Sequence, residues 1–123
     1  MSRVVHFDIT ANDVDKVIAF YEKALGWKFQ KWEGPMDYWL VTTGEEGAPG
    51  INGGFGRPDP EMPGTVNTVD VANIDDAIAR VKKYGGTIVR DKHEIPGVGW
   101  LAYFSDPEGT IFGMMEADPN AQM

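Results

Sequence analysis

The 123-residue chain has no cysteine, few basic residues and no long apolar run. The absence of cysteine excludes disulfide bonds, thiolate metal sites and cysteine nucleophiles. Eleven lysines and arginines stand against 19 aspartates and glutamates, so the formal net charge is −8 and the chain lacks the basic surface that nucleic acid or anionic lipid requires. No stretch approaches membrane-spanning length and no basic-then-apolar leader opens the chain, so we expect no nucleic acid, no membrane and a cytoplasmic location.

What the chain does contain is an internal repeat, since its second half echoes the first at a spacing of about 60 residues. The matched positions are Val14-Asp15 with Ile74-Asp75, Ile18-Ala19 with Ile78-Ala79, Lys23 with Lys83, Gly26 with Gly86, and Ile51-x-Gly53 with Ile111-x-Gly113. We therefore predict a single domain made of module one at about 3–56, a linker at about 57–64 and module two at about 65–116.

Each copy predicts a strand, a helix and three further strands. In module one, Val4 to Ile9 is a strand, and a helix capped by Asn12 or Asp13 ends at Gly26. The later strands are expected at Trp27 to Trp32, Tyr38 to Thr43, Ile51 to Phe55, Thr87 to Arg90, Trp100 to Ser105 and Ile111 to Glu116. One helix covers only one face of such a sheet, so the other face must bend around a partner sheet or a ligand. The fold class is therefore α+β, with two βαβββ modules forming a concave half-barrel.

Several short motifs, taken in this order, resemble the vicinal oxygen chelate superfamily, which includes glyoxalase I, bleomycin-resistance proteins and extradiol dioxygenases. The motifs are His6, Asn12-Asp13-Val14, Phe20-Tyr21, Gly26-Trp27 and Asp106-Pro107-Glu108-Gly109. The resemblance covers the chain up to Glu116 and implies the glyoxalase/bleomycin resistance-like fold.

In metal-using members of that superfamily, each module supplies one ligand from its first strand and one from its last. His6 matches the first of these positions. Its counterpart in module two is Val66 if the helices set the register, or Thr68 if the strand residues do. The family's carboxylate position is Gly113, and the pseudo-symmetric place in module one is Gly53.

The resemblance thus implies a degenerate metal site, with His6 as the one family ligand retained. A catalytic metal needs three protein ligands and an open position, so we expect no cofactor and at most weak binding of a divalent metal. The alternative is an unusual weak site in which Asp8 and Asp70 join His6. Glu116 lies three residues past Gly113, and this odd displacement along a strand points it to the opposite face.

His6 has three interpretations: a hydrogen-bonded wall residue, a ligand contact, or a general acid/base. His93 is expected in a solvated loop. Glycines inside strands mark bulges or the close approach of a ligand or another backbone, so Gly53 and Gly113 either make room for a ligand or let the modules pack. Further candidate ligand-binding residues are Tyr38, Asn52 and Trp100.

Three functions remain open from the sequence. We favour a small-molecule binding protein that holds an organic ligand without metal, as in bleomycin resistance. The alternatives are a metal-dependent glyoxalase-like lyase, isomerase or dioxygenase, and a non-catalytic structural or partner-binding module. A homodimer is expected, because the edges of half-barrels favour pairing between chains.

Overall fold

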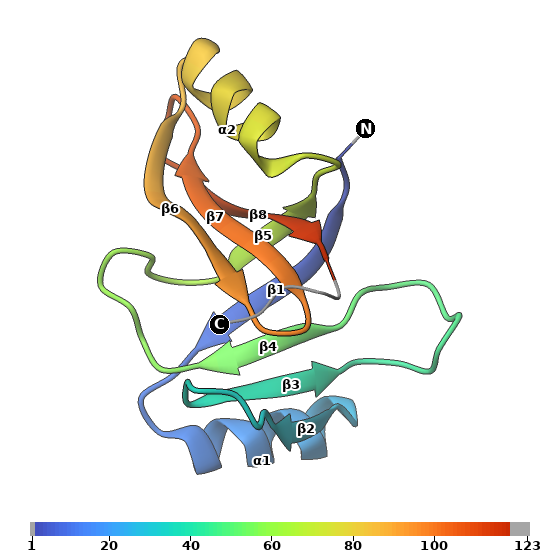
Figure 1. Cartoon of the computed structure of the whole chain (residues 1–123). Helices are drawn as coiled ribbons and strands as arrows, with labels where there is room; N and C mark the ends of the chain where they lie inside the picture. The colour runs from blue at the N-terminus through green and yellow to red at the C-terminus, as the bar shows by residue number, and fades with distance from the viewer. Residues whose placement is uncertain (1, 119–123) are drawn as a thin grey trace. The chain divides into compact units, whose positions relative to one another are not determined.

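The computed structural model describes residues 2–118. By its internal contacts the chain divides into two compact units. Unit one spans His6–Val66, and within the described residues unit two combines residues 2–5 with residues 67–118. Each unit carries one of the two predicted βαβββ modules (Figure 1).

Unit one is built on a four-stranded sheet with one helix. Its elements are β1 (Val4–Thr10), α1 (Val14–Leu25), β2 (Lys28–Lys31), β3 (Tyr38–Thr42) and β4 (Gly53–Gly56). The strand order is β2-β3-β4-β1, in which β1 runs parallel to β4 and the other pairs are antiparallel. Val4 and Val5 of β1 belong to unit two by their contacts.

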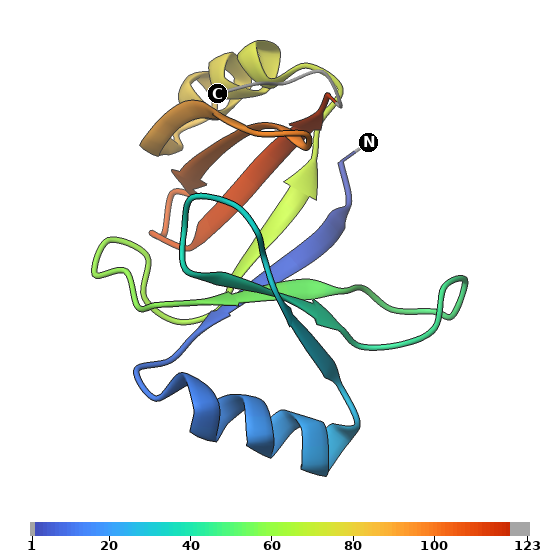
Figure 2. The same cartoon turned by 60° about the horizontal axis from the view of Figure 1, so that its bottom comes forward.

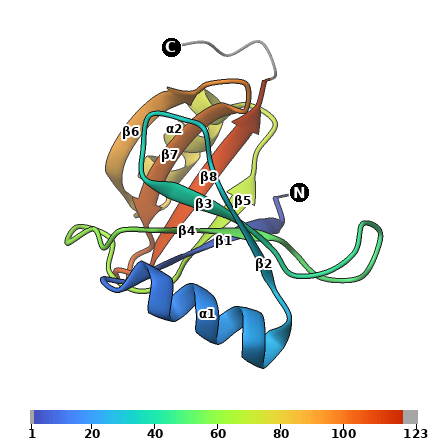
Figure 3. The same ribbon diagram turned by 90° about the horizontal axis from the view of Figure 1, so that it is seen from below.

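Helix α1 covers one face of this sheet (Figure 3). It begins after Asp13, whose side chain accepts a hydrogen bond from the Lys16 backbone N–H at 3.2 Å, and ends at Gly26, whose φ of 74° is left-handed. Its apolar side buries Val14 in one cluster with Val41 and Phe55 of the sheet. Aromatic side chains extend this cluster, among them Trp27, and Tyr21 stacks on Trp27 at a centroid distance of 4.9 Å.

Unit two repeats the plan. Its elements are β5 (Val66–Asp70), α2 (Ile74–Lys83), β6 (Thr87–Ile95), β7 (Gly99–Ser105) and β8 (Ile111–Ala117), with strand order β5-β8-β7-β6. Helix α2 lies on one side of these strands (Figure 2), where Ile74 and Ala77 pack on Ala102 and Met114. Asn73 caps the helix by accepting from the Asp76 N–H at 3.0 Å.

Glu116 supplies a second cap to α2. Its Oε1 accepts a hydrogen bond from the Ile74 backbone N–H at 2.8 Å, which places the side chain on the helix-covered face of β8. The prediction that Glu116 points away from the face of Gly113 is therefore confirmed.

The α+β fold of two βαβββ modules is confirmed, with one difference in β6. The polar segment around His93, expected to be a loop, continues β6 as far as Ile95. Two shifts of register, between Ile88 and Arg90 and between Arg90 and His93, let this segment pair with β7. Neither helix in residues 2–118 is long and apolar enough to cross a membrane.

Candidate functional site

Three polar side chains meet on the face of unit one that α1 leaves uncovered. Phe7 and Ile9 pack in the cluster beneath α1, and successive side chains on a strand point to opposite faces. His6 and Asp8 of β1 therefore point to the uncovered face. Tyr38 reaches them from β3, across β4.

The three side chains form one hydrogen-bonded group, the His6–Tyr38–Asp8 cluster. The Tyr38 hydroxyl donates to Asp8 Oδ1 at 2.5 Å, and His6 Nε2 lies 2.9 Å from Tyr38 Oη and 3.3 Å from Asp8 Oδ1. The His6 and Asp8 side chains are 34% and 24% exposed. A molecule from solvent can therefore reach both of them.

The network also fixes where the protons lie. Because the Tyr38 hydroxyl donates its hydrogen bond to Asp8, the arrangement that satisfies all three groups has the phenol oxygen accepting from His6, which assigns the ring hydrogen to Nε2. His6 Nδ1 and Asp8 Oδ2 have no hydrogen-bond partner within residues 2–118. The cluster therefore presents two acceptors to an incoming molecule.

A glycine makes this arrangement possible. Gly54 of β4 pairs with Asp8 of β1, and a Cβ built on Gly54 would overlap the Tyr38 hydroxyl and lie 2.6 Å from Asp8 Oδ1. Any side chain at this position would displace the phenol. The Tyr38 ring thus occupies the space that a side chain on β4 would otherwise fill.

The Trp32 ring packs against the ring of Tyr38. Their rings meet edge to face at a centroid distance of 6.0 Å, and the Trp32 backbone N–H donates to the Tyr38 carbonyl at 2.8 Å. The indole lies over Gly34, where a Cβ would overlap it. An apolar ring therefore borders the polar cluster.

The donor set does not fit a family metal centre. Within residues 2–118 no group of three or more His, Cys, Asp or Glu side chains is placed to hold a metal ion. Two oxygens bound tetrahedrally to one zinc at about 2.1 Å would lie about 3.4 Å apart, whereas Tyr38 Oη and Asp8 Oδ1 are 2.5 Å apart. This distance is that of a hydrogen bond between the two oxygens.

Strand pairing identifies a different module-one counterpart of Gly113 from the one that the sequence repeat predicted. Thr68 pairs with Gly113 and Asp8 pairs with Gly54, and both Thr68 and Asp8 stand six residues before the first residue of a helix. Gly54, and not Gly53, is thus the counterpart of Gly113. A Cβ on Gly53 would lie 2.7 Å from the Phe7 ring, in the helix-covered layer. The same spacing favours Val66 as the counterpart of His6.

The remaining predicted site residues make other contacts. Asn52 Oδ1 accepts from the Thr43 backbone N–H at 2.9 Å and closes the loop between β3 and β4. In unit two, Asp70 Oδ1 accepts from the Arg3 backbone N–H at 2.6 Å, and Gly113 faces Thr68 and Tyr103. Trp100 packs against the core beneath α2, which differs from its predicted place on the open face.

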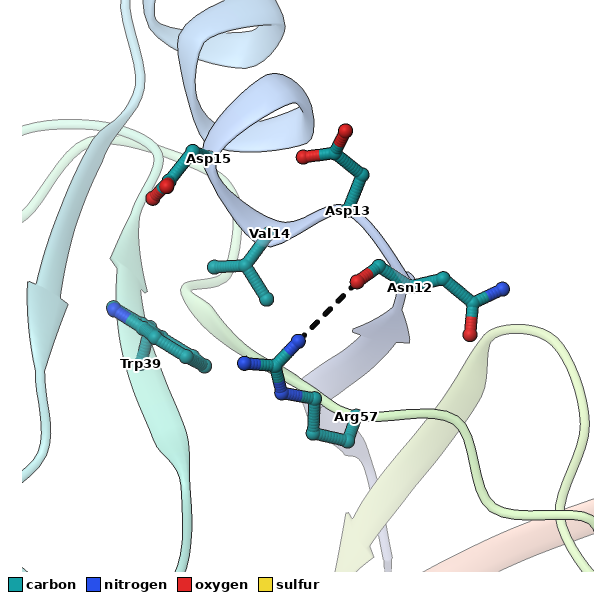
Figure 4. A pocket seen from close by; sticks show the side chains of 6 residues that line it. All are labelled: Asn12, Asp13, Val14, Asp15, Trp39 and Arg57. Carbon is teal, nitrogen blue, oxygen red and sulfur yellow. Dashed lines mark hydrogen bonds between the residues drawn. The ribbon is translucent and has the colours of Figure 1, made fainter.

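A pocket that the sequence did not indicate lies on the α1 side of unit one (Figure 4). It has a volume of about 490 Å³ and is lined by Asn12, Asp13, Val14, Asp15, Trp39 and Arg57. None of the three cluster residues lines it. The only sequence signal for it is Arg57 at the end of β4, and an isolated arginine in a polar linker indicates nothing by itself.

Arg57 is held in place by its neighbours. It donates from Nε to Asp37 Oδ2 at 3.1 Å and from Nη1 to the Asn12 carbonyl at 3.2 Å. Lys31 Nζ lies 3.0 Å from Asp37 Oδ1. Hydrogen bonds from Lys31 and then Arg57 hold the pKa of the Asp37 carboxyl below its usual value. These residues form an exposed ion-pair network around Trp39.

Comparison with known proteins agrees with this architecture. The model of the Glyoxalase/Bleomycin resistance protein/Dioxygenase superfamily matches residues 3–114. CFP32 of Mycobacterium bovis, which carries the provisional name glyoxylase, is 30% identical over 118 residues, covering 91% of this chain and 43% of CFP32. The chain thus spans less than half the length of this relative.

Two solved structures share the fold. Methylmalonyl-CoA epimerase from Mycobacterium tuberculosis has a TM-score of 0.68 at 18% identity, over 94% of this chain and 88% of its own. A superfamily member from Vibrio splendidus has a TM-score of 0.65 at 18% identity, over 96% of this chain and 100% of its own. With the family model matching nearly the whole chain, this chain belongs to the Glyoxalase/Bleomycin resistance protein/Dioxygenase superfamily.

Proposed function

We propose that this chain binds a small organic molecule at the His6–Tyr38–Asp8 cluster, without a metal. One observation carries the proposal: the Tyr38 phenol lies over Gly54 and is hydrogen-bonded to both His6 and Asp8. The two side chains best placed to act as metal ligands are thereby engaged by a phenol. The two atoms that remain open, His6 Nδ1 and Asp8 Oδ2, can accept hydrogen bonds from an organic group and are too few to hold a metal tightly.

The surroundings support binding of an organic molecule. Small-molecule sites combine apolar and aromatic walls with a few convergent polar groups. Here the Trp32 ring stands beside Tyr38, and His6 and Asp8 are both partly exposed. The names of the relatives do not identify the ligand, because CFP32 is more than twice as long as this chain and the epimerase shares the fold at low identity.

A ligand screen with a matched pair of variants tests the proposal. Metal-free protein is mixed with a metabolite library, and bound species are detected by native mass spectrometry and by shifts in melting temperature. Tyr38→Phe keeps the ring and removes the hydroxyl that joins the cluster. Tyr84→Phe makes the same change at a ring that is 71% exposed at the end of α2.

We expect at least one ligand that binds the wild type and Tyr84→Phe equally and binds Tyr38→Phe about tenfold or more weakly, because the variant loses the hydrogen bonds that position His6 and Asp8, and a hydrogen bond to a charged group contributes about 1.5–3 kcal/mol. The proposal fails if the ligands found bind both variants alike. It also fails if binding requires an added divalent metal.

A second candidate is acid–base catalysis by His6 without a metal. The observation that favours it is the open Nδ1, whose lone pair can take a proton from a bound molecule. A bound carbon acid incubated in D₂O would then incorporate deuterium with wild-type protein and not with His6→Gln. Equal exchange in both proteins would exclude this candidate.

A further inference from the structure

The hydrogen-bond inventory of the cluster limits the chemical class of its ligand. Both of its neutral donors are already used, because the Tyr38 hydroxyl donates to Asp8 and His6 Nε2 donates to Tyr38. The open atoms, His6 Nδ1 and Asp8 Oδ2, are acceptors. From this inventory we infer that the site takes a ligand with a protonated amine and discriminates against carboxylates and phosphates; this inference rests on the proposed function.

The charge distribution of unit one also favours a cationic ligand. Between His6 and Val66 there are ten Asp and Glu residues and five Lys and Arg residues. Lys31 and Arg57 form ion pairs with Asp37 beside Trp39. Trp39 packs in the layer beneath α1, which is on the opposite face of the sheet from the cluster. A carboxylate brought to Asp8 would therefore meet a like charge, which costs binding energy.

One basic residue of unit one, Lys28, lies on the same face of the sheet as the cluster. Lys28 of β2 pairs with Thr42, at the opposite end of β3 from Tyr38. It can reach a distant part of an elongated ligand but does not neutralise Asp8. The group that contacts Asp8 therefore has to bring its own positive charge or its own donor.

The Trp32 ring beside the cluster guides the choice of small molecules that test this inference. Trp32 stands edge-on to Tyr38, and aromatic rings favour both apolar and cationic neighbours. Phenethylamine, 2-phenylethanol and 3-phenylpropanoate present the same phenyl group with a cationic, a neutral and an anionic end. Differences in their affinity therefore report the charge that the site prefers.

The test is an NMR titration of the full chain with these three probes at neutral pH. Wild type is compared with Asp8→Asn, and with Asp15→Asn as the matched control. Asp15 lies in the first turn of α1, and its substitution removes one negative charge away from the cluster. The expected order for the wild type is amine, then alcohol, then carboxylate, with about tenfold or more between amine and carboxylate, as charge-assisted hydrogen bonds imply.

Asp8→Asn should abolish the preference for the amine, whereas Asp15→Asn should leave it within about twofold, as screened charges away from a site contribute little. A carboxylate that binds as tightly as the amine overturns the inference, as does an amine preference that survives Asp8→Asn. If 3-phenylpropanoate binds best and Tyr38→Phe weakens it, the proposed site stands and only the ligand class is wrong. Absence of amine binding also overturns the inference, while the metabolite screen separately decides the proposed function.

Discussion

Tyr38 of β3 forms hydrogen bonds with two side chains of β1, although β4 lies between these two strands. Its hydroxyl lies within hydrogen-bond distance of His6 and Asp8, and it does so only because Gly54 has no side chain. A phenol in this place converts two potential metal ligands into a hydrogen-bonded acceptor pair. The absence of a side chain at Gly54 therefore determines whether the phenol can reach this pair.

Replacing Gly54 by alanine should displace Tyr38. A Cβ there overlaps the phenol, so we expect a loss of about 1–3 kcal/mol in the free energy of unfolding, as for other overpacked positions, and weaker binding at the cluster. Gly56→Ala is the matched control, because its nearest neighbour would be Tyr38 Cδ1 at an ordinary 3.6 Å. Urea denaturation of the two variants checks this; equal stability would show that the ring can move aside at no cost.

Asp37 should contribute a pH-dependent increment of stability. Lys31 and Arg57 lower the pKa of its carboxyl in the folded state, so the folded state binds protons less readily than the unfolded one. The increment is therefore fully present above the unfolded pKa of about 4 and is lost as the pH falls through the lower folded pKa.

We expect the melting temperature of Asp37→Asn to fall slightly below that of the wild type at pH 7, and the difference to vanish near the acid limit and in high salt. Melting curves recorded from pH 7 to pH 3 decide this. A difference that grows as the pH falls would contradict the ion-pair explanation.

The sequence predicted the members of the cluster better than their contacts. Alternation along β1 placed His6 and Asp8 on one face, and Tyr38 was predicted as a binding residue at the start of another strand. The hydrogen bond from Tyr38 to Asp8 crosses β4, and no local pattern reports a contact between residues 30 positions apart. Gly53 was chosen over Gly54 because the repeat was matched by sequence spacing, whereas the loop before β4 shifts the pairing by one residue.

At the scale of elements, both helices follow their capping signals. Asp13 and Asn73 accept hydrogen bonds from backbone N–H groups three residues ahead, and Gly26 ends α1 in the left-handed region. These are local interactions, so the sequence predicted them closely. The end of β6 was missed because its polar residues, including His93, pair with β7 at an outer strand, where burial imposes little alternation.

Glu116 should stabilise α2 through the hydrogen bond that it accepts from Ile74. Glu116→Ala removes this acceptor and is expected to lower the free energy of unfolding by about 1–2 kcal/mol, the range of a lost N-terminal cap. Glu116→Gln keeps an amide oxygen in place and should lose less. Chemical denaturation compares the two, and an alanine variant as stable as the glutamine variant would show that the cap contributes nothing.

At the scale of the whole molecule, the fold is that of the superfamily, whereas the function has to be read from the site. Apart from His6, the motifs that carried the resemblance lie in or at the ends of helix α1 and in a turn, so they report the fold and say little about the ligand. CFP32 is more than twice as long as this chain, so its assembly is no guide to that of this chain. We propose that two copies of this chain associate in solution.

A homodimer is the prediction that follows. In residues 2–118, β2 and β6 end their sheets with one edge unpaired, and such edges favour association with another chain. Sedimentation at micromolar concentration should therefore give about twice the 13.6 kDa mass of the chain. A single species at monomer mass across this range would contradict the prediction.

Thermal melting of metal-free protein with Zn²⁺, Ni²⁺, Mn²⁺ or Fe²⁺ tests whether the cluster is a hydrogen-bonded acceptor site or a metal centre. A ligand at one hundred times its dissociation constant stabilises the folded state by about 2.7 kcal/mol, so tight binding of a metal would shift the curve clearly. Because the cluster offers only two open ligand atoms, His6 Nδ1 and Asp8 Oδ2, and a tightly held metal needs at least three protein ligands, we predict that none of these metals at modest excess moves the melting temperature appreciably. A large stabilisation that His6→Ala abolishes and His93→Ala preserves would contradict this assignment and make the cluster a metal site.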